Sequence, residues 1–254
     1  MKKITLLLLA VFATFTINAQ TADEIIATYF ENIGGLENLK KIKGMKMNIT
    51  MNMQGMEIPI EAIELADGRQ MSVAKFQGKE IKQGVFDGEV LWSHNFMTMK
   101  AEKSDAEATA NFKLDANDFP GALIDYKEKG YTVELIGKET IEGAETFKIK
   151  LTKEPVTIDG KKEDSVSFYF FDTEDFVPIV LQSEIKSGPA KGQNSETKMS
   201  DYQEVEGIYF PFSMTQGLKG QPGQTMTITK IELNPTVDDS IFAFPDEVAT
   251  EEKK

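Results

Sequence analysis

The chain has 254 residues, a formal net charge of −13, one histidine and no cysteine. The acidic charge argues against nucleic-acid partners and against adsorption to anionic lipid headgroups. Without cysteine the chain has no disulfide, no thiolate metal ligand and no N-terminal cysteine to carry a lipid. Its single histidine, His94, leaves no His pair for a metal site or for general-base catalysis. We therefore expect neither a metal nor another cofactor.

The first nineteen residues have the pattern of a secretory signal. Lys2 and Lys3 precede an apolar run, and the segment ends at the small residue Ala19. This run is too short to span a bilayer. We expect cleavage near Ala19, a soluble periplasmic protein folded as one domain over residues 20–246, and a flexible tail at 247–254.

Two short helices are predicted at the start of the mature chain. Ile25, Ile26, Tyr29, Phe30 and Ile33 form one helical stripe, and two glycines follow directly at 34–35. Leucine and isoleucine residues over 36–42 indicate a second short helix.

Strands dominate the rest of the chain, and the first hairpin is rich in methionine. Odd-numbered apolar residues from Met45 to Met53 alternate with polar ones, and Met56, Ile58 and Ile60 continue the alternation after a turn. This face either forms ordinary sheet core or lines a cavity for an apolar ligand, because methionine adapts to varied apolar partners. Further strands, separated by turn dipeptides, are predicted at 60–66, 69–76, 80–86, 89–93, 131–141, 145–152, 165–171, 177–186, 196–203, 208–218 and 224–233. The sequence therefore predicts a mainly β (α+β) fold with a curved antiparallel meander.

One segment interrupts the strands. Residues 101–128 contain Ala106, Ala108, Ala110, Phe112 and Leu114, which favour a helix. A second short helix or a loop is expected over 118–125, near its proline. The insertion is either a lid over a cavity or a plain helix that covers the sheet.

Catalytic patterns are absent from the sequence. There is no G-x-S-x-G nucleophile motif, and carboxylates cluster as neighbours at turns, such as Asp172 to Asp175, rather than in two different environments. We therefore expect a protein that is not an enzyme.

Six segments, in this order, resemble the LolA/LolB-like superfamily, and more narrowly the outer-membrane lipoprotein-sorting proteins of Bacteroidetes type. They are Ile33–Leu36, Glu64–Met71, Phe86–Trp92, Gly143–Leu151, Phe170–Pro178 and Asp239–Phe242. The resemblance implies a half-open antiparallel β-barrel, closed by helices that act as a lid, and a soluble carrier of acylated lipoprotein or lipid. It also implies membrane-bound donor and acceptor proteins as partners. Because fold does not fix function, a non-shuttling lipid- or protein-binding sensor module of the same fold is the alternative.

The resemblance and the methionine hairpin together predict the residues of a hydrophobic cavity. Trp92 would anchor its rim or form ordinary core, and Arg69, the only arginine, would hold the lid or serve as a surface turn residue. The predicted cavity residues are Met45, Met47, Ile49, Met51, Met53, Met56, Ile58, Met71, Trp92, Phe112 and Phe119.

Overall fold

A computed structural model describes residues 20–53 and 55–245. The predicted signal at 1–19 and the predicted tail at 247–254 lie outside these residues. Among the helices in the described ranges, none has the length and apolarity needed to cross a membrane.

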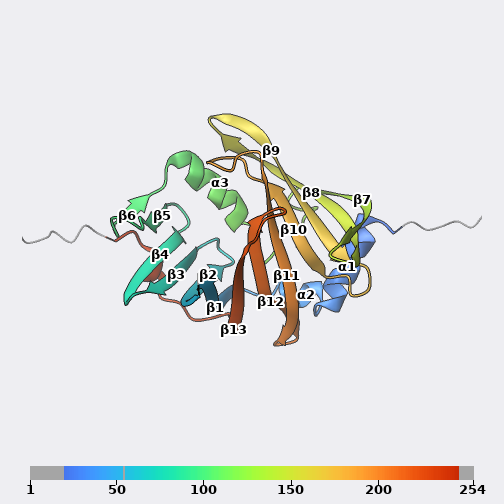
Figure 1. The fold of residues 1–254 in the computed structure, drawn as a ribbon, viewed down its shortest axis with the longest axis horizontal. Helices are drawn as coiled ribbons and strands as arrows, with labels where there is room; N and C mark the ends of the chain where they lie inside the picture. The colour runs from blue at the N-terminus through green and yellow to red at the C-terminus, as the bar shows by residue number, and fades with distance from the viewer. Residues whose placement is uncertain (1–19, 54, 246–254) are drawn as a thin grey trace, which may run out of the picture.

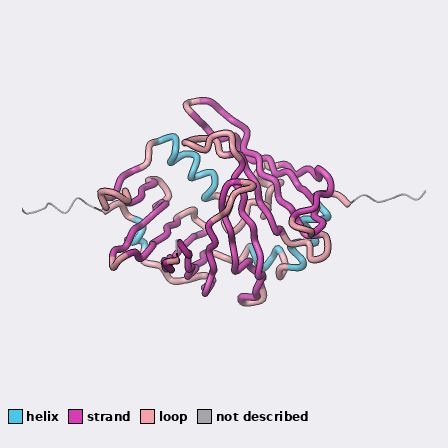
Figure 2. The backbone as a smooth tube through the Cα atoms, viewed as in Figure 1, coloured by secondary structure: helices cyan, strands magenta, loops and turns pink. Residues whose placement is uncertain are grey.

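All strands belong to one antiparallel sheet of 13 strands, which curves but does not close (Figure 1). The strand order is β6-β5-β4-β3-β2-β1-β13-β12-β11-β10-β9-β8-β7, so only the β1–β13 pair joins strands that are not consecutive. The expected mainly β, half-open architecture is confirmed, and Figure 2 shows how strands dominate the chain. The strands are β1 (Gly44–Met53), β2 (Met56–Leu65), β3 (Gln70–Phe76), β4 (Lys79–Phe86), β5 (Leu91–His94), β6 (Ala101–Lys103), β7 (Thr132–Ile141), β8 (Ala144–Ile158), β9 (Lys161–Asp172), β10 (Pro178–Glu184), β11 (Asn194–Val205), β12 (Ile208–Leu218) and β13 (Gln224–Leu233).

The β8–β9 hairpin is longer than the sequence predicts. Strands are predicted at 145–152 and 165–171, whereas β8 continues to Ile158 and β9 begins at Lys161. Proline cannot donate a ladder hydrogen bond and is unfavourable inside a strand. The structure accommodates Pro155 at a register shift between Lys153 and Val156, and pairing with β9 resumes beyond it. A bulge therefore lets both strands continue to the turn at 159–160.

Helix α1 (Ala22–Asn32) begins with a capping box. The Glu24 amide donates to the Thr21 hydroxyl at 3.2 Å, and the Thr21 amide donates to the Glu24 carboxylate at 2.8 Å. After the helix, Gly34 has φ +112° and lies against the β11–β12 turn, where an added Cβ would come within 2.1 Å of the Gly207 carbonyl oxygen. Glycine is therefore required here for both conformation and space. The second predicted helix is α2 (Leu36–Leu39).

The insertion contains one α-helix, α3 (Ala106–Ala116), capped by the Asp105 side chain. Residues 118–125 form turns, so of the two predicted alternatives the loop is correct. A short 3₁₀ helix, η1 (Asp239–Phe242), follows the last strand.

The sheet has a core on each face. On the face called here the inner face, α1, α2 and residues 119–131 pack against both halves of the sheet, with Ile25, Ile149 and Leu151 fully buried. On the opposite, outer face of β2–β5, η1 covers a smaller core built around Trp92 and Phe242.

Candidate functional site

A row of methionines crosses the inner face over four neighbouring strands. Met51 of β1 pairs with Met226 of β13, Met226 pairs with Met214 of β12, and Met214 pairs with Met199 of β11. Directly paired residues place their side chains on the same face of a sheet. This methionine row is therefore continuous, and Ile58 of β2 extends it beyond Met51.

The methionine row lies at the border of the inner core. Met214 and Met226 pack against the core but remain half-buried, and Met51 and Met199 are also half-buried. At the tip of the β1–β2 hairpin, Met53 is 38% exposed and Met56 is 47% exposed. Flexible, polarizable side chains thus line an incompletely covered apolar strip.

Helix α3 lies over the inner face and bridges the two halves of the sheet (Figure 1). On one side the Phe112 ring packs edge-on against Phe86 of β4, with ring centroids 5.5 Å apart. On the other side, Asn111 forms two hydrogen bonds with the backbone of Thr157 in β8, at 2.6 and 2.9 Å. The helix is in the position of a lid over the inner face.

A partly buried ionic network fastens the C-terminal end of α3 to β8. The Lys153 ammonium lies 2.7 Å from the carboxylates of both Asp115 and Asp118. Asp118 also accepts hydrogen bonds from Tyr131 and Lys129. The two carboxylates raise the pKa of Lys153 against the opposing effect of its burial, which is the largest single influence. Lys153 therefore stays charged while it holds the helix.

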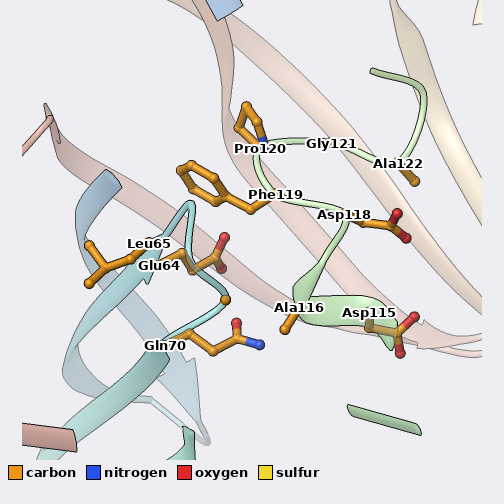
Figure 3. Close-up of a pocket in the computed structure, with 11 residues that line it drawn as sticks. Glu64, Leu65, Gln70, Asp115, Ala116, Asp118, Phe119, Pro120, Gly121 and Ala122 are labelled. Carbon is orange, nitrogen blue, oxygen red and sulfur yellow. The ribbon is translucent and has the colours of Figure 1, made fainter. Parts of the chain in front are cut away.

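A pocket of about 280 Å³ opens between the β2–β3 turn and the end of α3 (Figure 3). Glu64 and Gln70, paired across β2 and β3, form one wall, and Ala116, Phe119 and Pro120 form another. Burial raises the pKa of the Glu64 carboxyl above its ordinary value.

The structure divides the predicted cavity residues between the two faces. Nine of them lie on the inner face, where Met45, Ile49 and Ile58 are core, Phe112 belongs to α3 and Phe119 lines the pocket. The remaining inner-face residues are Met47, Met51, Met53 and Met56.

Met71 and Trp92 belong to the core of the outer face. Met71 pairs with Ile63, whose partner in β1 is Lys46 rather than a methionine. The Trp92 indole donates to the Phe242 carbonyl oxygen at 3.0 Å, which matches the core alternative for this residue. Both side chains therefore lie on the face opposite the methionine row.

The hydrogen bonds and ion pairs of Arg69 within the described residues go to other elements than α3. Its guanidinium bonds the Asp67 and Asp239 carboxylates at 2.8 and 2.6 Å and lies over the Phe242 ring. These contacts match the alternative of a turn residue and connect the β2–β3 turn with η1.

His94 has a structural role. Its Nδ1 accepts a hydrogen bond from the Lys82 amide at 3.0 Å, and burial, with a contribution from the Lys82 charge, lowers its pKa. Within residues 20–53 and 55–245, no group of three or more His, Asp or Glu side chains is arranged to hold a metal ion.

The inner face also holds four residues that are not among the predicted ones, Met199, Met214, Met226 and Glu64. The alternation within 208–218 and 224–233 indicates strands, but only the β1–β13 pairing brings their methionines next to Met51.

No protein-family model and no curated protein matches the chain. Solved structures do match. A provisionally named outer membrane lipoprotein-sorting protein domain from Vibrio parahaemolyticus is 9% identical, with a TM-score of 0.50, over 86% of this chain and 94% of that one. A LolA superfamily protein from Nitrosomonas europaea is 13% identical, with a TM-score of 0.50, over 89% and 98%.

A DUF1329 family protein from Desulfovibrio piger is 13% identical, with a TM-score of 0.51, over 86% of this chain and 97% of that one. At these identities the comparisons show the fold alone. The chain thus has a LolA-like fold, as the resemblance predicted.

Proposed function

We propose that this protein is a soluble periplasmic carrier that binds the acyl chains of lipoproteins, or a similar hydrophobic ligand, for sorting to the outer membrane. The methionine row is the observation that carries the proposal. Four half-buried methionines on adjacent strands form an apolar strip that adapts to its partner, and α3 lies over the same face. The LolA-like fold supports the same function.

The free energy gained when an acyl chain is buried is large enough that its release needs a mechanism. Burial of an acyl chain gains ~0.8 kcal/mol per methylene, so one long chain gains on the order of 10 kcal/mol before ordering costs. A state that disfavours the ligand must therefore exist. Displacement of α3, promoted by membrane-bound donor and acceptor proteins, would supply that state.

The test uses protein that is expressed as the full chain and purified from the periplasm without detergent. Native mass spectrometry is expected to show a bound species of lipid or lipopeptide mass. The stripped protein is expected to take up N-phenyl-1-naphthylamine, with displacement by a palmitoylated peptide. A charge in the methionine row removes apolar contact, so Met51→Glu should weaken uptake by about 30-fold or more, the equivalent of ~2 kcal/mol.

Met97→Glu is the matched control, because Met97 is 95% exposed in the β5–β6 loop. The same substitution there should leave uptake unchanged. Met226→Gln, a milder change in the row, covers the case in which Met51→Glu does not fold. If folded wild-type protein binds neither N-phenyl-1-naphthylamine nor the palmitoylated peptide, the proposal fails. A protein-binding sensor module then becomes the better interpretation.

A further inference from the structure

The pocket between the β2–β3 turn and α3 contains one carboxylate that points into it. Figure 3 shows the Glu64 carboxylate directed toward the space between β2 and residues 118–120, while the carboxylates of Asp115 and Asp118 point away from that space. The three acidic residues therefore differ in what they can bind.

The three carboxylates also differ in whether a cationic side chain pairs with them. Lys153 neutralises Asp115 and Asp118 from the side of β8. Among the described residues, no side chain forms a hydrogen bond or an ion pair with the Glu64 carboxylate, and no lysine or arginine lines the pocket. A partly buried carboxylate without a partner costs free energy, which a bound cation would offset.

The remaining walls suit an organic cation. Phe119 lines the same pocket as Glu64, and aromatic rings attract ammonium groups. The Gln70 side chain, paired with Glu64 across the two strands, supplies an amide oxygen as a further acceptor. The volume of about 280 Å³ accommodates a small head group rather than a whole lipid.

We propose that this pocket binds the ammonium head group of an amine-bearing amphiphile, with Glu64 as its counter-ion. The inference rests on the proposed function, because the apolar chain of the same ligand would lie along the inner face. Glu64 and Ile58 are six residues apart on β2, a span of about 20 Å. Between them Ala62 and Ile60 stay partly exposed on the same face.

The test compares dodecylamine, below its critical micelle concentration, with dodecanol, below its solubility limit, as competitors of N-phenyl-1-naphthylamine. For the wild-type protein at neutral pH, dodecylamine should displace the probe at a concentration at least about 10-fold lower than dodecanol. Glu64→Gln should remove this preference without weakening dodecanol. Butylamine, which has the amine but no chain, should not displace the probe.

Glu61→Gln is the matched control, since Glu61 lies on the outer face of the same strand and pairs with Lys46. It changes the net charge as Glu64→Gln does, so it should keep the preference. A preference that survives Glu64→Gln, or that Glu61→Gln also removes, overturns the head-group proposal. Displacement of the probe by butylamine, which lacks the apolar chain, would also overturn the head-group proposal. If neither long-chain competitor displaces the probe, the proposed function itself fails.

Discussion

Removal of the Phe242 side chain should destabilise the protein through the core of the outer face. Phe242 ends η1 and is fully buried against β2–β5, together with Val85 and Trp92. Its carbonyl oxygen accepts the Trp92 indole hydrogen bond at 3.0 Å. Because that bond uses the backbone, Phe242→Ala removes only the ring and its packing.

The expected loss follows from complete burial of the ring. Phe→Ala changes in protein cores cost about 3–5 kcal/mol, from lost transfer free energy and the cavity that remains. For a domain of this size, each 1 kcal/mol lowers the Tm by about 2–4 °C. Phe242→Ala should therefore lower the Tm by about 6–20 °C.

Thermal and urea unfolding, followed by circular dichroism, measure this loss. Phe96→Ala is the control, since Phe96 is 67% exposed in the β5–β6 loop and should change the free energy of unfolding by less than about 0.5 kcal/mol. Uptake of an apolar probe by folded Phe242→Ala should equal that of wild type, because the ring lies on the outer face. A loss below about 1 kcal/mol would refute the role given to η1.

Three further predictions concern single contacts. Lys153→Met removes the cation shared by Asp115 and Asp118 and leaves Asp118 with Lys129 at 3.3 Å, so it should cost about 1.5–3 kcal/mol in urea unfolding and speed amide exchange in α3. Lys138→Met, at an exposed pair, should cost less than about 1 kcal/mol. Since the pKa of Glu64 is raised in the folded state, its ionised form destabilises the fold above that pKa. Glu64→Gln should therefore raise the Tm at pH 7 by a few degrees at most, and melts at descending pH should show the gain disappear as Glu64 protonates. Thr21→Ala removes the hydroxyl of the capping box and should cost about 1 kcal/mol in urea unfolding, with faster exchange in the first turn of α1; an unchanged midpoint would contradict a stabilising cap.

The sequence by itself determined the elements of this protein. The five-residue apolar stripe and the two glycines located α1 and its end, and period-two alternation with turn dipeptides located most strands. These signals are local, because helix and strand periods and turn chemistry depend on neighbouring residues. The bulge at Pro155 depends on the pairing of β8 with β9, and strand β6 has only three residues. Neither has such a local signal, and neither was predicted.

Only the tertiary structure decided which side chains share a face. Alternation fixes the two faces within one strand, but the register across each turn decides which face of the next strand joins them. That register placed Met71 and Trp92 opposite the methionine hairpin. The pairing of β1 with β13 brought Met226 and Met214, more than 160 residues away in the chain, beside Met51, since a sheet joins strands whatever their separation in sequence.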